Sequence, residues 1–203
     1  MSELPARRRQ RADARRSSAT VLNAAIELLG RRPEASMDDI ASAAGVARQT
    51  VYAHYPSRKA LITAIVDRLT TETAEALAGI DANAGSATDA LRAWLEESWR
   101  LMHRYPVLLT PAIAAVEGGD SYERHIPIMD TLLPILERGR RDGEFDAAQP
   151  VHWYVSAIVA LGHAAGQEVI AERMSVTAAG LAFRAAALRV GTGRQRCDHA
   201  TGN

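Results

Sequence analysis

Apolar side chains recur at helical spacing along most of this 203-residue chain. The first stretch places four of them at i, i+3, i+4 and i+7, on one face of a helix: Leu22, Ala25, Ile26 and Leu29. Ser36 followed by Asp39 is a helix start signal, and Gly45 ends that helix. The same reasoning predicts helices over residues 37–44, 48–54, 58–77, 89–105, 106–117, 121–141, 149–173 and 175–190, with a loop over 80–88. Pro134 lies inside one of these helices and predicts a kink there.

Composition supports an all-α fold. Apolar residues make up 47% of the chain and aromatic residues only 5%, and 39 residues are alanine, the best helix former. The formal net charge is zero, yet residues 1–60 contain 11 Lys and Arg against 6 Asp and Glu, whereas residues 61–203 contain 13 against 18. A basic N-terminal part and an acidic C-terminal part indicate a polyanion-binding module joined to a part with another function.

The chain therefore divides into four segments. Residues 1–16 include six arginines and almost nothing to bury, which predicts a disordered basic arm. Residues 17–62 form an N-terminal three-helix domain, residues 63–190 a larger C-terminal helical domain, and residues 191–203 a disordered tail. The helix over 58–77 is about 30 Å long at the usual rise per residue, which is long enough to link two bodies.

Residues 36–61 have the form helix, glycine turn, helix, which is a helix-turn-helix. Four apolar side chains pack its two helices together: Ile40, Ala44, Val46 and Val51. The outer face of the second helix is then free. Arg48, Gln49 and Thr50 lie at its start, where the positive end of the helix dipole and the side-chain donors can meet phosphates and base edges in a major groove.

Three runs within residues 40–61, Ala-x-x-Ala-Gly-Val, Thr-Val-Tyr-x-His-Tyr and Pro-Ser-Arg-x-Ala-Leu, resemble the tetracycline-repressor (TetR) family of transcriptional regulators. The resemblance extends loosely over 18–67, and beyond that rests on helix count, chain length and the run at 136–145. It implies that Tyr52 faces DNA with Gln49 and Thr50, that His54 lies near phosphates, and that Arg58 replaces a phosphate-binding lysine. The expected DNA-binding set is Ser36, Arg48, Gln49, Thr50, Tyr52, His54, Arg58 and Lys59.

Two positions depart from the family pattern. Lys59 stands where an acid is common and adds positive charge, and Ala47 stands where a serine often caps the second helix. The missing cap predicts a recognition helix that is less ordered without DNA. Tyr52 and His54 have packing between domains as an alternative role, and the basic arm is either a solvated tail or a phosphate or minor-groove contact.

The last two predicted helices carry stripes of small side chains. The resemblance implies that these helices form a four-helix interface between two subunits, as suits a protein that reads two DNA half-sites. The alternative is a bundle within one chain. The expected dimer-interface residues are Ala157, Leu161, Ala164, Ala165, Glu168, Ala179, Phe183 and Ala186.

The middle helices carry bulky, adaptable side chains. Such residues are usually core, but the resemblance implies a small, mostly apolar effector bound between these helices. The expected effector-binding residues are Trp94, Ser98, Met102, Met129, Tyr154 and Ile158.

Motifs of catalysis, metal binding and phosphate binding are missing from the sequence, so we expect no enzyme activity, no cofactor and no metal. The one cysteine, Cys197, cannot form an internal disulfide, and the first ten residues lack the apolar segment of a secretion signal. The longest run without charged residues, 147–167, is interrupted by polar side chains. We therefore expect a cytoplasmic protein without a membrane segment.

The sequence thus predicts a ligand-responsive transcriptional regulator, a repressor that binds a palindromic double-stranded DNA operator as a homodimer and is released by its effector. Effector binding is expected to swing the helix over 58–77 and change the separation of the two DNA-reading helices. One alternative is a DNA-binding helical protein without a small ligand, controlled by a protein partner or acting architecturally. Another is a helical enzyme or binding module that retains the front domain.

Overall fold

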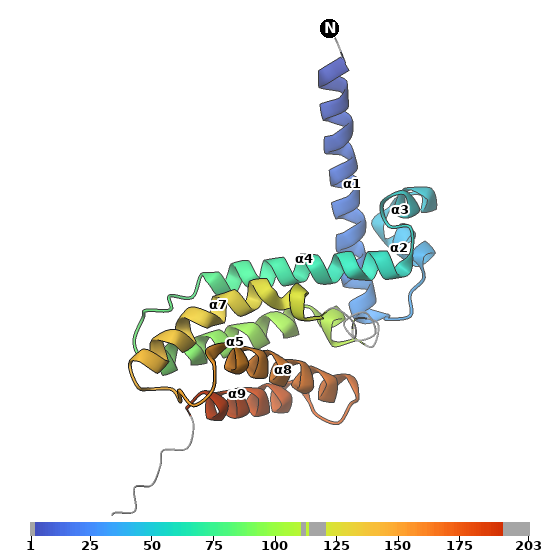
Figure 1. Cartoon of the computed structure of the whole chain (residues 1–203). Helices are drawn as coiled ribbons and strands as arrows, with labels where there is room; N and C mark the ends of the chain where they lie inside the picture. Colours follow the sequence, from blue (N-terminus) through green and yellow to red (C-terminus); the bar gives the residue numbers. More distant parts are fainter. Residues whose placement is uncertain (1–2, 111–112, 114–120, 193–203) are drawn as a thin grey trace, which may run out of the picture. The chain divides into compact units, whose positions relative to one another are not determined.

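The computed structural model describes residues 3–110, 113 and 121–192, and every regular element in this part of the chain is a helix. Figure 1 labels the α-helices: α1 (Glu3–Arg31), α2 (Met37–Ala44), α3 (Arg48–His54), α4 (Arg58–Ala78), α5 (Ala87–Arg104), α7 (Ser121–Arg141), α8 (Val151–Ile170) and α9 (Val176–Thr192). The 3-10 helix η1 (Pro106–Leu109) follows α5. The predicted all-α fold is confirmed for the described residues. Among the described helices, none is both long and apolar enough to cross a membrane.

The chain forms two compact units, and the boundary between them lies within α4 and again near the end of α5. Unit 1 comprises Met1–Thr70 and Met102–Arg124, and unit 2 comprises Thr71–Leu101 and His125–Asn203. The predicted boundary at residue 63 therefore moves to Thr70, and residues 106–109 belong with the N-terminal unit rather than the C-terminal domain. The physical reason is that Val107 of η1 is fully buried in the apolar core of unit 1.

Unit 1 is built around one apolar core, to which α1, α2, α3, the first turns of α4 and η1 all contribute. Its fully buried side chains include Val21, Ala25, Leu29, Ile40, Val51, Leu61, Ile65 and Val107. Each buried Val, Leu or Ile stabilises the fold by about 1.5–3 kcal/mol relative to an exposed one. This core fixes α2 and α3 against α1 and leaves their other faces to solvent.

Residues 3–16 form part of a helix rather than the disordered arm that the composition of segment 1–16 predicts. The structure continues α1 through it from Glu3, so that one helix runs from there to Arg31. Arginine and alanine are good helix formers, and residues 6–29 contain no glycine or proline. The packed C-terminal half of α1 supplies the helix nucleus, and extension beyond it costs little free energy.

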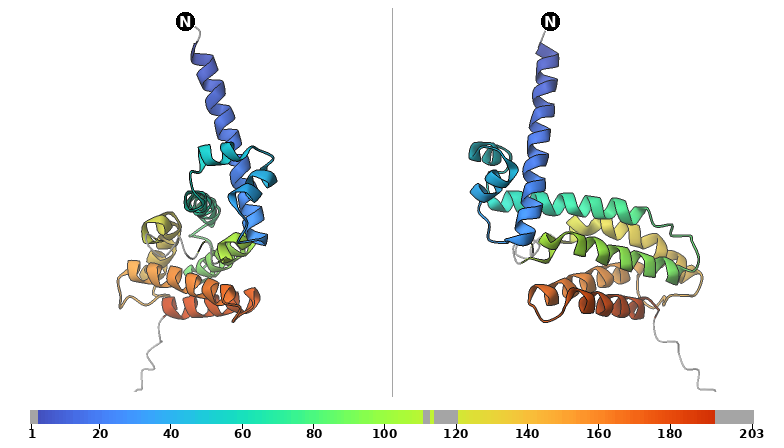
Figure 2. Two further views of the ribbon diagram at one scale, coloured as in Figure 1. Left: turned by 90° about the vertical axis from the view of Figure 1, so that its right-hand side faces the viewer. Right: turned by 180° about the vertical axis from the view of Figure 1, so that it is seen from behind.

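In unit 2, α8 and α9 lie side by side and run antiparallel (Figure 2). A tight corner joins them, in which Glu172 adopts a left-handed φ of 56° and the Arg173 N–H turns back to the Glu168 carbonyl at 2.9 Å. Gly180 allows α9 to approach α5 closely, because a Cβ atom at this position would lie 2.2 Å from Nε1 of Trp99. At this crossing the absence of a side chain on Gly180 makes room for the Trp99 ring.

A long-range cap fixes the start of α5 in unit 2. The two carboxylate oxygens of Glu144 accept hydrogen bonds from the backbone N–H groups of Ala87 at 2.8 Å and Thr88 at 2.9 Å. These backbone donors hold the pKa of the Glu144 carboxyl below its ordinary value. The carboxylate thus satisfies two N–H groups that the first turn of a helix leaves without partners.

Several predicted helix bounds need correction. Residues 106–117 do not begin as an α-helix: 106–109 form the 3-10 helix, and most of the remainder lies outside the described residues. α8 is shorter than predicted because the corner at residues 171–175 ends it early. α9 extends through Gly191 and Thr192, and the rest of the predicted tail lies outside the described residues. α7 has the predicted bounds and contains both Pro127 and Pro134, and the kink at Pro134 stays a prediction.

Candidate nucleic-acid interface

A capping box closes the start of α2, the first helix of the helix-turn-helix. Ser36 Oγ accepts a hydrogen bond from the Asp39 N–H at 3.1 Å, and the Ser36 N–H donates to Asp39 Oδ2 at 2.8 Å. The Ser36 hydroxyl also donates to that carboxylate at 2.6 Å, and these bonds lower the pKa of Asp39. Ser36 is therefore first of all a helix cap, and its contact with DNA stays a prediction.

The turn between α2 and α3 depends on Gly45. Its φ of 66° lies in the left-handed region that strains other residues, and its N–H closes α2 on the carbonyls of Ala41 and Ser42. α3 then begins at Arg48 after Ala47, which makes no side-chain cap, as the sequence indicates. The predicted bounds of both helices, 37–44 and 48–54, are confirmed.

One face of α3 is held by the core of unit 1. Val51 is fully buried, and Tyr55, directly after α3, is buried with its hydroxyl 2.9 Å from Ser18 Oγ of α1. The same hydroxyl donates to the Ser18 carbonyl at 3.3 Å. This anchor is not among the contacts predicted from the sequence. The available signal was spacing, since Tyr55 lies four residues after Val51 and so shares its inward face.

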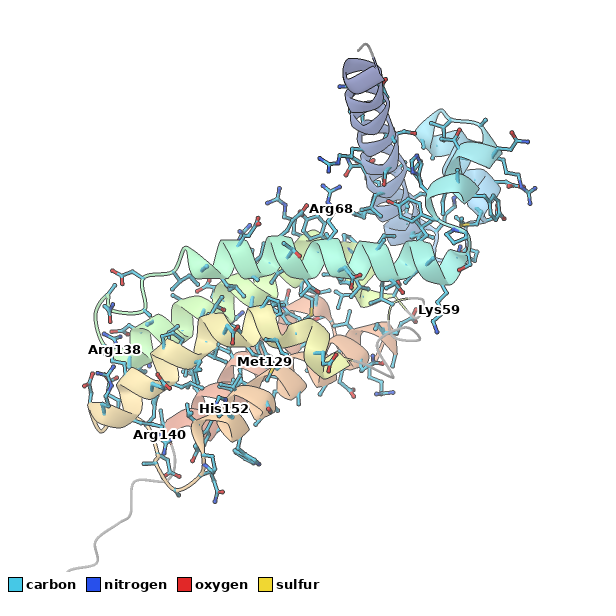
Figure 3. All side chains as sticks on the ribbon, turned by 45° about the horizontal axis from the view of Figure 1, so that its top comes forward. Lys59, Arg68, Met129, Arg138, Arg140 and His152 are labelled. Atoms are coloured by element: carbon cyan, nitrogen blue, oxygen red, sulfur yellow. The ribbon has the colours of Figure 1, made fainter. Side chains whose placement is uncertain are left out.

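The opposite face of α3 is open to solvent. Arg48, Gln49 and Tyr52 are exposed, with 38% of the Tyr52 surface accessible, whereas Thr50 and His54 are half-buried. Arg48 and Tyr52 are four residues apart and lie on one face of the helix. We call Arg48, Gln49 and Tyr52 the α3 patch. Lys59 is also exposed and projects from the beginning of α4 (Figure 3).

Arg48 makes two contacts within unit 1. Its Nη1 donates to Oδ2 of Asp38, in the first turn of α2, at 2.8 Å. Its guanidinium carbon lies 5.3 Å from the centroid of the Tyr52 ring, a cation–π distance. The side chains of Arg48 and Asp38 are 64% and 55% exposed, so water screens their attraction. Arg48 is thus placed on the patch but paired with an acid of its own chain.

Arg58 has a different role from the predicted phosphate contact. Its two terminal guanidinium nitrogens donate to the carbonyl oxygens of Pro33 and Ala35, which precede α2. α4 itself begins with a cap, because Ser57 Oγ accepts from the Ala60 N–H at 3.1 Å. Arg58 therefore fastens the beginning of α4 to the entry of the helix-turn-helix, and its contact with DNA stays a prediction.

The expected effector-binding residues do not all fall in one unit. Met102 belongs to unit 1, whereas the other five belong to unit 2. There Trp94, Met129, Tyr154 and Ile158 are buried, and Ser98 is half-buried with its hydroxyl donating to the Leu95 carbonyl of its own helix. Trp94 Nε1 donates to Thr131 Oγ1 at 2.8 Å, a polar contact that the sequence analysis missed.

Three of the expected dimer-interface residues face inward. Ala165, Ala179 and Phe183 are buried within the chain, and the Phe183 ring lies 5.9 Å from the Trp99 ring, centroid to centroid. Contacts within unit 2 already cover these three residues, and their contact with a partner subunit stays a prediction. Ala164 is exposed, and the other four are half-buried: Ala157, Leu161, Glu168 and Ala186. Of these, Glu168 pairs with Arg173 at 2.7 Å.

Comparisons with known proteins agree with the helix-turn-helix geometry. Residues 21–65 match the family model described as bacterial regulatory proteins, tetR family. The curated HTH-type transcriptional repressor LfrR of Mycolicibacterium smegmatis is 36% identical over 81 residues, which are 40% of this chain and 43% of that repressor. The match thus spans less than half the length of that relative.

Two crystal structures extend the similarity to the fold of most of the chain. The TetR-like transcriptional regulator LfrR from Mycobacterium smegmatis, in complex with proflavine, has a TM-score of 0.62 at 24% identity, covering 86% of this chain and 96% of that one. A TetR-family transcriptional regulator from Pectobacterium atrosepticum has a TM-score of 0.69 at 22% identity, covering 88% and 91%. Residues 21–65 thus match the tetR family of bacterial regulatory proteins, and the fold of the chain is similar to that of TetR-like regulators.

Proposed function

We propose that the chain is a transcriptional regulator that reads double-stranded DNA with the α3 patch. The observation that carries this proposal is an exposed set of donors on a helix whose opposite face is anchored by Val51 and Tyr55. An α-helix fits the major groove, where arginine pairs with guanine and glutamine with adenine. The family match covers this segment, and the family is described as one of bacterial regulatory proteins.

A second subunit supplies the second recognition helix in this proposal. α8 and α9 carry apolar side chains that remain exposed: Trp153, Ala160 and Ala164 on α8, and Ala178, Leu181, Ala182 and Ala185 on α9. Trp153 and Leu181 are 53% and 57% exposed, which is unfavourable for large apolar side chains that meet only water. Two copies related by a twofold axis would bury these faces against each other in a four-helix interface.

The proposed effector is small and mostly apolar and binds within unit 2. The support is a buried set of aromatic and aliphatic side chains that includes Trp94 and Tyr154, with Trp94 Nε1 donating to the half-buried Thr131 Oγ1. LfrR, a relative with this fold, binds proflavine, a planar ligand. α4 contributes residues to both units, so a ligand that favours one position of α4 would change the spacing of two recognition helices.

Selection of bound sequences from random duplexes tests the DNA-reading function. The proposal expects a palindrome with half-site centres about 34–36 Å apart or a multiple of this distance. Replacing Gln49 and Thr50 together by alanine should abolish the selection while the helical circular dichroism spectrum is kept. If the folded chain selects no sequence at low ionic strength, the proposal fails.

Ligand response is tested on the selected duplex. Proflavine is the first probe, followed by a panel of small apolar compounds, and release of the duplex is measured by fluorescence anisotropy. Coupling is reciprocal, so the duplex must weaken ligand binding by the same factor. A selected palindrome that no compound releases would favour the alternative of a DNA-binding protein controlled by a protein partner.

A further inference from the structure

Two histidines that are distant in sequence meet inside unit 2. His125 lies in the second turn of α7 and is 8% exposed, and His163 lies on α8 and is half-buried. Their Nε2 atoms are 3.1 Å apart. The ring centroids are 4.5 Å apart, and the ring planes are inclined by 69°. Neither residue belongs to the candidate DNA interface or to the expected effector-binding set.

The rings meet obliquely rather than head to head. If both rings pointed straight at each other along the N···N line, their centroids would be farther apart than the two nitrogens. The difference would be about 2.3 Å, which is twice the distance from an imidazole centroid to its nitrogen. Here the centroid separation of 4.5 Å exceeds the N···N distance of 3.1 Å by only 1.4 Å. At least one ring is therefore turned away from the N···N line, as binding of both nitrogens to a point beside that line requires.

That point suits a metal ion. With metal–nitrogen bonds of about 2.0–2.1 Å, two nitrogens 3.1 Å apart subtend an angle of about 95–100° at the ion. This angle lies between the octahedral and tetrahedral values. Two imidazoles at this separation are thus already spaced as neighbouring ligands of one ion.

The contact between the two rings favours uncharged imidazoles, because two imidazolium ions at this separation would repel each other. A neutral imidazole is the form that binds metal ions. For both Nε2 atoms to bind, the ring that donates the shared N–H must carry its proton on Nδ1 instead. That change moves the proton from one nitrogen of the ring to the other, and the ring does not lose a proton.

We propose that His125 and His163 form a binding site for a late first-row transition metal ion, Cu²⁺ or Zn²⁺. Imidazole nitrogen prefers these ions over Mg²⁺ or Ca²⁺, and Cu²⁺ stands above Zn²⁺ in the usual order of affinity. Among the described residues no group of three His, Cys, Asp or Glu gathers around an ion, so water fills the remaining positions. Met129 follows His125 by one helical turn on α7 and is buried. This inference does not depend on the DNA-reading function.

Equilibrium competition against a chromophoric chelator tests the site with CuCl₂ or ZnCl₂ as the probe. The full chain is used with Cys197→Ser and His199→Gln throughout, because these two residues near the C-terminus are alternative ligands. His125→Gln and His163→Gln are compared with His152→Gln, a matched control at the exposed start of α8 (Figure 3). We expect one ion per chain in the starting protein and in the control, and at least tenfold weaker binding in the other two.

The proposal is overturned if the starting protein binds no ion, or if His125→Gln and His163→Gln bind as tightly as His152→Gln. Circular dichroism confirms that each variant folds. Should a glutamine variant fail to fold, electron paramagnetic resonance of Cu²⁺ in the starting protein decides the matter. Coupling to two imidazole nitrogens supports the site, and coupling to one or none overturns it.

Discussion

Asp38 should weaken DNA binding by holding Arg48, and Asp38→Asn should therefore strengthen it. In the free protein Arg48 Nη1 lies 2.8 Å from Asp38 Oδ2, so the guanidinium must give up this partner to reach DNA with the same nitrogen. The carboxylate also lies beside α3, where it repels phosphates. Asparagine removes the charge and keeps a side chain of similar size.

The magnitude follows from the exposure of the pair. Both side chains are more than half exposed, so the ion pair belongs to the class worth about 0.2–1 kcal/mol. If Asp38→Asn removes the free energy of this ion pair at one half-site, DNA binding becomes about 1.4- to 5-fold tighter. If it does so at two half-sites, binding becomes about 2- to 30-fold tighter. The gain should shrink as salt is added, because salt screens exposed charges.

Fluorescence anisotropy with the selected operator at several salt concentrations measures the effect. Asp142→Asn is the matched control, since it removes the same charge from an exposed position in unit 2. The double variant Asp38→Asn with Arg48→Ala should bind no better than Arg48→Ala alone, apart from the loss of repulsion. If folded Asp38→Asn binds operator no more tightly than Asp142→Asn, the reasoning is refuted.

Three further predictions concern stability and positioning. Gly180→Ala should destabilise unit 2 by about 1–3 kcal/mol by overpacking against Trp99. Gly162→Ala, whose Cβ would lie 3.5 Å from Phe183, should raise the melting temperature or leave it unchanged. Equal melting temperatures for the two variants would contradict this prediction. Glu144→Gln should lower the free energy of unfolding by about 1 kcal/mol at neutral pH, as losing a helix cap does. Because folding lowers the pKa of Glu144 from 4.5, the stabilisation by this carboxylate is complete above that pH and is lost as the pH falls through the lowered value. The free energies of unfolding of the two proteins in urea should therefore converge in acid. A difference that stays constant with pH would be inconsistent with the cap. Arg58→Lys should reduce the thermal stability of unit 1, since one ammonium cannot reproduce the fork that binds the Pro33 and Ala35 carbonyls; unchanged stability with weaker operator binding would restore the phosphate role.

The helices with strong local signals were predictable from the sequence. α2 has its capping box and its terminal glycine, and its bounds match the prediction, as do those of α3. The basic segment before residue 17 was mispredicted because composition shows how little it can bury, whereas its helical state follows from continuity with the packed half of α1.

The side of each helix that faces the core was harder to predict than the helix itself. Along α9 small and apolar residues occur on every side, so the sequence does not distinguish Ala179 and Phe183, which are buried, from Leu181 and Ala182, which are exposed. Hydrophobic periodicity identifies an inward face only where polar residues mark the outward one. Only the tertiary contacts of Phe183 with Gly162 and Trp99 show which side of α9 faces inward.

The order of residues alone determined that the chain is helical, where α2 and α3 begin and end, and which family pattern the turn between them follows. These features depend on interactions between residues a few positions apart, which the sequence states directly. Only the tertiary structure decided that Arg48 meets Asp38, that Glu144 caps α5, and that His125 meets His163. Each of these contacts joins different elements of the fold, and packing of the apolar core, rather than local sequence, brings them within reach.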